Sequence, residues 1–233
     1  MSKIKTIFSK VNLKIRTIAS RSILLRFFER TFSKVHSQIL SEDLENIKNS
    51  SATDLVIVAH PDDETIFCGS HILNNNCFVV CLTNKSNNIR HTDFSFVMDK
   101  TNSDFIMLDY PDLTKNLVNN WNKVEKSIEY DLTQIITAKQ WSKIITHNPN
   151  GEYNHLHHKK TSRIVRTICK NNKLNCLYYF YYDKAKPLDN FDEKLNLLNV
   201  YRVHQPNAVN FLENTAKCEQ IIAQSDYVKT KII

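Results

Sequence analysis

The sequence predicts an α/β fold with a Rossmann-like, doubly wound and mostly parallel sheet and helices on both faces. Short, continuous apolar runs are typical of strands buried on both faces of a parallel sheet. Such runs recur along the chain with helical patterns between them, which is the order of an α/β fold. The runs are 55–59, 78–82, 105–108, 143–146 and 177–182. Sheets of this kind bind ligands at the carboxyl ends of their strands, so functional residues are expected just after each run.

The clearest helical pattern begins at Leu117. Apolar residues follow it at spacings of three or four, which places them on one face of a helix. They are Leu117, Trp121, Val124, Ile128, Leu132 and Ile135. The pattern predicts one long helix over residues 117–135 that packs through this face.

Length and composition predict one folded domain that begins near Asp54. The chain has 233 residues, of which 42% are hydrophobic and 24% charged, as in globular proteins. The six cysteines form no Cys-x-x-Cys pair, which argues against a zinc ribbon and a disulfide-stapled scaffold. We therefore expect reduced, mostly buried thiols and a domain over 54–233, preceded by a polar junction at 41–53.

Residues 1–40 form a basic arm in front of this domain. They contain nine Lys or Arg residues and one Glu, whereas the rest of the chain has a net charge of −1. Apolar residues recur at helical spacing from Ile4 to Ile18, so we expect a basic amphipathic helix. Two uses fit such a helix: peripheral contact with an anionic membrane surface, and packing on this domain or on a partner. An organelle transit peptide would share the composition.

Composition also bounds localisation and partners. No uncharged apolar run approaches the roughly 20 residues of a membrane span. Basic residues interrupt every candidate signal-peptide core. Because the body of the domain is nearly neutral, no nucleic-acid partner is expected. We expect a cytoplasmic protein, for which any membrane contact through the arm is peripheral.

The first apolar run leads into the polar cluster Ala59-His60-Pro61-Asp62-Asp63-Glu64. A strand that ends in this way places polar side chains, which are costly to bury, at the edge of the sheet where a cleft is expected. Carboxylate oxygen and imidazole nitrogen suit zinc or another divalent transition metal. Adjacent Asp62 and Asp63 point in different directions, so one can bind a metal while the other faces a bound water. The alternative is a plain helix start, where Pro and acidic residues favour the first turn.

A second polar cluster follows the run that ends at Thr146. Residues 147–158 read His-Asn-Pro-Asn-Gly-Glu-Tyr-Asn-His-Leu-His-His and hold four of the nine histidines. The Asn-Pro-Asn-Gly part predicts a turn, with a helix from about His157. One helical turn would bring His155 and His158 to the same side. A single histidine would more often be structural, but this density beside a predicted cleft favours a site.

The two glycines of the chain lie next to these clusters. Gly69 comes five residues after Glu64, and Gly151 comes four residues before His155. In a chain with so little glycine, these positions predict backbone conformations or close approaches that no side chain would permit.

Together the two clusters resemble the PIG-L/LmbE-like family of zinc-dependent N-acetylglucosaminyl de-N-acetylases. The resemblance rests on Ala-His-Pro-Asp-Asp-Glu after a buried strand and on Thr-His-Asn-Pro-x-Gly-Glu-Tyr-x-His-x-x-His. It covers about residues 54–205. Its smaller matches are Thr83, Asn84, Arg90, Asp93, Lys194, Tyr201 and Gln205. It implies a deacetylase domain over 54–233 that acts on a GlcNAc-containing small molecule or glycoconjugate.

The resemblance also implies a metal centre. His60, Asp63 and His158 would bind Zn²⁺, or another divalent transition metal, and water would complete an open coordination site. Asp62 would be the general base for the attack of that water on the acetamide carbonyl. The reaction would be hydrolysis of a linear amide that releases acetate.

The remaining roles carried over by the resemblance concern four residues. His155 would act as general acid or as electrostatic support for the oxyanion, and Tyr153 would contact the oxyanion or the acetyl group of the substrate. Arg90 would hold hydroxyls or a phosphate of the substrate. His147 matches a family position near the site, and we interpret it as structural. Whether His155 or protonated Asp62 gives the leaving amine its proton is open.

The sequence departs from the family pattern at three positions. Asn154 stands where the family usually has glycine, and Ser70 stands where a second glycine often follows. His157 stands where the family usually has aspartate, and a neutral imidazole brings no charge to a neighbouring histidine. The alternative function is therefore a non-catalytic glycan-binding protein on the same fold. Neither the aglycone nor the oligomeric state is predicted.

Overall fold

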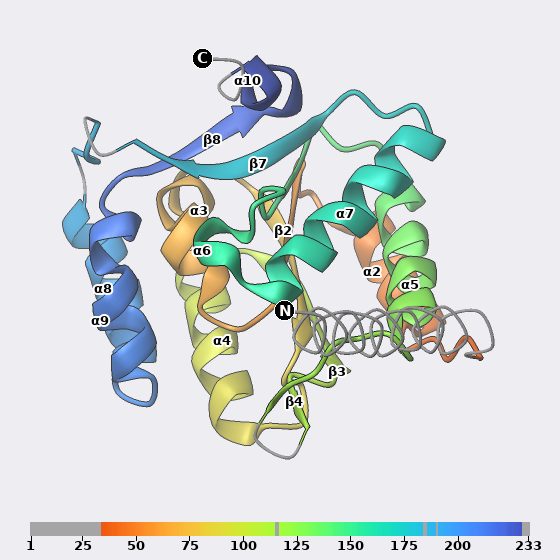
Figure 1. Cartoon of the computed structure of the whole chain (residues 1–233), viewed down its shortest axis with the longest axis horizontal. Coiled ribbons are helices and arrows are strands. Elements are labelled where there is room, and N and C mark those ends of the chain that lie inside the picture. The colour runs from red at the N-terminus through yellow and green to blue at the C-terminus, as the bar shows by residue number, and fades with distance from the viewer. Residues whose placement is uncertain (1–33, 115–116, 184–185, 190, 230–233) are drawn as a thin grey trace, which may run out of the picture.

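The computed structural model describes residues 34–114, 117–183, 186–189 and 191–229. Its centre is a six-stranded sheet with strand order β3-β2-β1-β6-β7-β8 (Figure 1). The strands are β1 (Asp54–Val58), β2 (Cys77–Thr83), β3 (Asp104–Tyr110), β6 (Lys143–Thr146), β7 (Leu177–Tyr182) and β8 (Glu219–Ala223). All neighbouring strands are parallel except β7 and β8. The predicted α/β, mostly parallel fold is confirmed, and each predicted apolar run forms a strand.

Helices cover both faces of the sheet, as the doubly wound prediction requires (Figure 1). On one face lie α3 (Asp63–Asn74), α4 (Asn88–Lys100), α8 (Phe191–Arg202) and α9 (Pro206–Ala216). On the other lie α2 (Ser41–Asn49), α5 (Glu125–Thr137) and α7 (Leu156–Asn171). Strand β1 supplies both layers, because Leu55 and Ile57 face one core while Val56 and Val58 face the other.

The strand order reverses beside β1, and this reversal positions the site. The chain runs outward from β1 through β2 to β3, then returns to β6 on the other side of β1. Strands β1 and β6 pair in parallel, with Ile57 opposite Thr146. Their carboxyl ends therefore open into the same crevice, the position at which doubly wound sheets bind ligands. Both polar clusters of the sequence follow these two strands.

The helix predicted over 117–135 is wrong in its first part. Helix α5 begins at Glu125, and residues Leu117–Val118 instead form β5, which pairs with β4 (Leu113–Thr114). Two asparagine side chains break the helical path, because Asn119 and Asn120 each accept a backbone N–H two residues ahead, at 2.7 and 3.0 Å. Trp121 has φ 54°, which is not a helical conformation, and its side chain is fully buried. It is therefore a core residue that does not belong to the apolar face of α5.

The segment in front of β1, which the sequence predicts as a polar junction, contains a helix. Residues 41–49 form helix α2, whose Ile47 is fully buried in the core. Of the basic arm, residues 1–33 lie outside the described residues, so its helix and its membrane contact stay predictions. Within the described ranges, no helix combines the length and apolarity that crossing a bilayer requires.

Both glycines and all cysteines fit their predictions. A Cβ on Gly69 would lie 2.9 Å from Cε of Lys194, and Gly151 adopts φ 66°, so neither position suits a side chain. The six cysteines are free, and all but Cys176 are buried. Burial raises the pKa of the Cys77 thiol to about 12, so this thiol stays protonated at neutral pH.

Candidate metal centre and active site

The first side of the site is a strained turn between β1 and α3. Asp62 precedes the helix with φ 120° and ψ −31°, a conformation that residues other than glycine rarely adopt. The turn is held by hydrogen bonds: the Asp62 N–H donates to Glu64 Oε2 at 3.0 Å, and its carbonyl accepts from the Ile66 N–H at 2.9 Å. Strain of this kind concentrates at functional sites.

The buried carboxyl group of Glu64 supports this turn. Glu64 is fully buried and accepts hydrogen bonds from Tyr201 Oη at 2.6 Å and Thr65 Oγ1 at 2.8 Å. Burial raises the pKa of Glu64, and these hydrogen bonds limit the rise. Tyr201, on α8, therefore holds the carboxyl group of Glu64, and Glu64 in turn holds the backbone N–H of Asp62.

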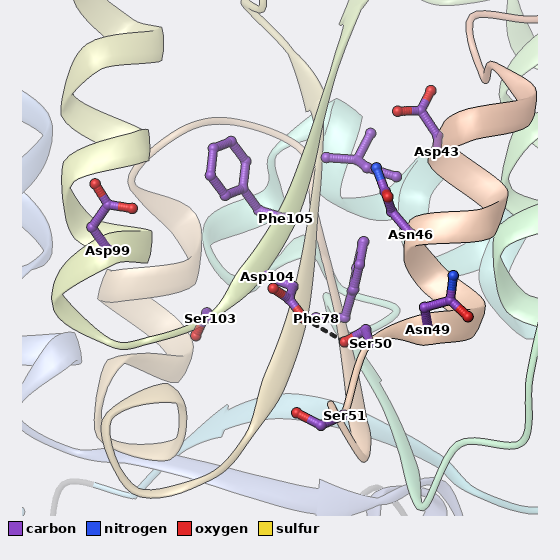
Figure 2. Close-up of a pocket in the computed structure, with 11 residues that line it drawn as sticks. Asp43, Asn46, Asn49, Ser50, Ser51, Phe78, Asp99, Ser103, Asp104 and Phe105 are labelled. Carbon is purple, nitrogen blue, oxygen red and sulfur yellow. Dashed lines mark hydrogen bonds between the residues drawn. The ribbon is translucent and has the colours of Figure 1, made fainter.

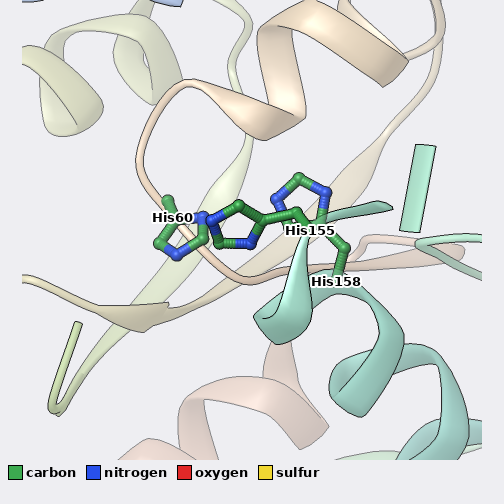
Figure 3. A group of neighbouring side chains, drawn as sticks. All are labelled: His60, His155 and His158. Carbon is green, nitrogen blue, oxygen red and sulfur yellow. The ribbon is translucent and has the colours of Figure 1, made fainter. Parts of the chain in front are cut away.

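The second side of the site is the segment after β6, which contains the short helix α6 (Gly151–Asn154) and the first turn of α7. It brings His155 and His158 against His60, as Figure 3 shows. Three sets of side chains here place one potential ligand atom each within 4.8 Å of one another. The sets are His60, His155 and His158; Asp63, His147 and His158; and His60, Asp112 and His157.

Asp63 lies between two imidazoles. Its Oδ2 is 3.2 Å from His60 Nδ1, and its Oδ1 is 3.3 Å from His158 Nε2. Although burial opposes it, the imidazoles of His158 and His147 hold the pKa of Asp63 well below its usual range. Donor atoms around a tetrahedral ion with bonds of about 2.0 Å lie about 3.3 Å apart. Each imidazole nitrogen thus faces a different oxygen of Asp63, at a distance close to that between two ligands of one zinc ion.

One buried nitrogen of this group has no hydrogen-bond partner among the described residues. His158 places Nδ1 2.7 Å from Glu152 Oε2, while its Nε2 is buried, unpartnered and aimed at Asp63. Although burial opposes charging, the carboxylates of Asp63 and Glu152 raise the pKa of His158 to about 10. The same two carboxylates would favour a metal ion at Nε2 in place of the proton, because both stabilise positive charge at this position.

His147 has both ring nitrogens engaged. Its Nε2 accepts the Ala59 N–H at 3.0 Å, so its Nδ1 carries the proton and donates to Glu152 Oε2 at 2.9 Å. The ring also stacks on His158, with ring centroids 3.8 Å apart. This geometry agrees with the structural interpretation of His147, because no lone pair is left for a metal.

His155 and Tyr153 lie at the open side of the cluster. Burial, His158 and His60 lower the pKa of His155 to about 3, so its ring is neutral at pH 7. Tyr153 is 44% exposed, with its ring 5.6 Å from that of His155. Burial, together with Asp63 and Asp62, raises the pKa of Tyr153. Its phenol therefore stays protonated and can donate a hydrogen bond.

Arg90 lies beside Asp62. Arg90, on α4, donates from Nη2 to the Pro61 carbonyl at 2.6 Å and lies 3.9 Å from Asp62 Oδ1. Burial and the neighbouring Asp63 raise the pKa of Asp62 well above its usual value, although Arg90 opposes the shift. Asp62 is thus the carboxylate of this site best prepared to take up a proton.

Comparison with known proteins places both clusters in one family. Residues 55–169 match the family described as PIG-L, GlcNAc-PI de-N-acetylase. Residues 55–169 form a PIG-L family domain. An uncharacterized protein of Acanthamoeba polyphaga mimivirus is 32% identical over 149 residues, which is 57% of this chain and 63% of the viral protein. Membership of the family suggests a metal-dependent de-N-acetylase, and the matched range contains both polar clusters.

The PIG-L comparison also explains a departure in the sequence. Asn154, where the family usually has glycine, adopts φ 76°. This left-handed conformation favours glycine, and asparagine is among the residues that tolerate it best. The substitution therefore preserves the backbone path into α7.

Sequence reasoning assigned no role to two carboxylates of this PIG-L site. Glu152 has a side chain only 2% exposed and binds both His147 and His158. Asp112 lies 3.5 Å from His60 Nε2 and follows β3 at its carboxyl end. The rule that ligands bind after each strand points to Asp112. The backbone at Glu152, with φ 52°, has no sequence signal apart from the neighbouring glycine.

Replacing Glu152 with glutamine is expected to lower the unfolding free energy by about 1–3 kcal/mol at pH 7. One amide oxygen cannot replace two carboxylate oxygens that accept from His147, His158 and the Asn148 N–H. Although burial opposes it, the two imidazoles lower the pKa of Glu152. Its stabilising effect is therefore present above the unfolded pKa of about 4.3 and is lost as pH falls through the folded pKa.

Urea unfolding of both proteins with a chelator present, at pH 7 and at pH 3.5, measures this difference. The gap between wild type and Glu152→Gln should shrink at the lower pH. A gap that is the same at both pH values would contradict the assigned role of the carboxylate.

A separate cavity lies at the opposite end of the strands. It has a volume of about 650 Å³ and is lined from α2, α4 and the starts of β2 and β3. Figure 2 shows Asp43 and Asp99 on either side of β3, with Asp104 bound by Ser50 between them. Its distance from the carboxyl ends of β1 and β6 separates it from the histidine cluster.

Proposed function

We propose that this PIG-L protein hydrolyses the N-acetyl group of a GlcNAc-containing sugar or glycoconjugate with the help of a bound metal. The observation that carries the proposal is the unpartnered Nε2 of His158, which faces Asp63 at the crevice between β1 and β6. A buried imidazole nitrogen without a hydrogen-bond partner, 3.3 Å from a buried carboxylate oxygen, suits a cation. The family match supports a GlcNAc-containing substrate.

His60, Asp63 and His158 would hold the metal. Their nitrogen and oxygen donors suit Zn²⁺, and another divalent transition metal would accept the same set. When bound, such an ion polarises a carbonyl oxygen and lowers the pKa of water toward neutrality. His147 would take no part in binding, because each of its nitrogens has a hydrogen-bond partner.

Asp62 would act first as base and then as acid. It takes a proton from the attacking water as the new C–O bond forms at the acetamide carbonyl. When the C–N bond breaks, Asp62 returns this proton to the leaving amine, and acetate is released. The raised pKa of Asp62 supports both steps. The lowered pKa of His155 argues against an imidazolium acid at neutral pH.

The other residues would stabilise and hold the substrate. Neutral His155 and the protonated phenol of Tyr153 can donate hydrogen bonds to the developing oxyanion. Tyr153 is exposed enough to contact the acetyl group of a substrate that enters from solvent. Arg90 lies beside Asp62 and would bind sugar hydroxyls or a phosphate through its guanidinium.

Acetate release from a panel of substrates tests this function. The zinc-loaded full chain is mixed with GlcNAc-PI, GlcNAc-inositol and GlcNAc oligosaccharides, and acetate is measured. We expect release from at least one conjugate, a loss of at least about 10²-fold when a chelator removes the metal, and recovery when zinc is restored. Sugar binding by calorimetry without acetate from any conjugate would instead establish a glycan-binding protein.

A further inference from the structure

We propose that His157 is a positioning residue that fixes which nitrogen of His60 faces the metal. His157 Nδ1 lies 2.9 Å from His60 Nε2, on the side of the ring away from Asp63. The inference rests on the proposed function only in that His60 serves as a metal ligand. No charge on His157 is needed, because the argument depends on where each ring carries its proton.

The proton of His157 is placed by a backbone carbonyl. His157 Nε2 is 2.6 Å from the Asn119 carbonyl oxygen, which can only accept, so Nε2 carries the hydrogen. The ring is fully buried and packs between Trp121 and His60. A neutral imidazole has one N–H, so Nδ1 of His157 is an acceptor.

This assignment determines the protonation of His60. A nitrogen–nitrogen distance of 2.9 Å is a hydrogen bond and requires one proton, which His60 Nε2 must therefore provide. Nδ1 of His60 is then left with its lone pair, 3.2 Å from Asp63 Oδ2. Glu152 orients His158 in the same way, through the nitrogen remote from Asp63. In both imidazoles, an outer partner thus engages one nitrogen and leaves the nitrogen that faces Asp63.

Trp121 makes His157 rigid. The two rings stack with centroids 4.0 Å apart and planes inclined by 4°. Trp121 is itself anchored, because its Nε1–H donates to the Pro111 carbonyl at 2.7 Å. The buried indole and the Asn119 carbonyl therefore hold the imidazole of His157 in position along two directions.

A second metal ion bound by His60, Asp112 and His157 is the competing interpretation. The distance of 2.9 Å between the two ring nitrogens is shorter than the roughly 3.3 Å between donors of a tetrahedral ion. Asp112 Oδ1 is 3.5 Å from His60 Nε2 and 3.8 Å from His157 Nδ1. A shared proton explains the short distance better than a shared metal does.

Two substitutions at this position separate the hydrogen bond from the packing. His157→Phe keeps a ring on Trp121 but removes the acceptor, whereas His157→Asn keeps an acceptor near the Nδ1 position but removes the ring. Zinc affinity of the full chain is measured by competition with a chelating dye, and thermal unfolding of the zinc-free proteins reports folding. We expect His157→Phe to weaken zinc binding by about 10- to 100-fold and His157→Asn to stay within about threefold of wild type.

Wild-type affinity in His157→Phe would overturn the proposal, as would equal losses in both variants. So would two zinc ions per wild-type chain, or none. Nitrogen NMR of the wild-type histidine rings in the zinc-bound protein gives a second test that needs no variant to fold. It should show His60 protonated at Nε2, and a proton at Nδ1 would contradict the assignment. These measurements use no substrate, so a failure to release acetate would count against the proposed function alone.

Discussion

Replacing Asp62 with asparagine is expected to lower the rate of acetate release by about 10² to 10⁴-fold. Asparagine has nearly the same shape and tolerates the positive φ of this position, but its amide accepts no proton from water. Because Asp62 is not among the proposed ligands, zinc affinity should stay within about threefold of wild type. Steady-state kinetics and chelator competition measure the two effects separately.

Asp63→Asn is the matched control for this prediction. The side chain has the same size and lies one residue away, but its carboxylate faces both His60 and His158. We expect it to lose zinc affinity and activity together. Normal turnover in Asp62→Asn would remove the base assignment, and a loss of zinc binding in Asp62→Asn would make Asp62 a ligand.

Replacing Lys194 with methionine is expected to lower the unfolding free energy by about 3–5 kcal/mol. Lys194 is fully buried, and its Nζ donates to the Ile66 and Ala216 carbonyls, both at 2.8 Å, and to Glu219. Burial lowers the pKa of Lys194, and Glu219 opposes the shift. Methionine fills the same space but leaves a buried carboxylate without its cation.

Urea unfolding measures this effect, and two further variants control it. Lys48→Met changes an exposed lysine that pairs with Glu45, so its effect should stay within about 0.5 kcal/mol. Adding Glu219→Gln to Lys194→Met removes the unpaired charge and should recover most of the loss. A loss below about 1 kcal/mol in Lys194→Met would show that the buried pair contributes little.

The sheet and the two halves of the site follow from local sequence patterns. Strands such as β1 are continuous apolar runs because both faces are buried, and this property is visible in the sequence. The polar residues after β1 and β6 stand out against these runs. The two polar clusters are predicted to lie together because parallel strands place their carboxyl ends at one edge of the sheet.

The errors arise where tertiary contacts override local spacing. Trp121 has the spacing of a helix face, yet it leaves the helix to stack on His157, 36 positions further along the chain. No local pattern encodes this contact. The partner of His157 could not be predicted from the sequence either. The family pattern relates an aspartate at this position to a neighbouring histidine of the second cluster. The structure instead places His157 against His60, in the first cluster.

Residues in the last third of the chain support α3, and these contacts affect where the chain can be shortened. Tyr201 and Lys194 both lie beyond residue 169, where the range matched by the family comparison ends, yet they hydrogen-bond to the helix that carries Asp63. Edge strand β8 contributes Glu219 to the same support. A fragment that ends at residue 169 would therefore lack the three side chains that support α3 and, through Glu64, the backbone of Asp62.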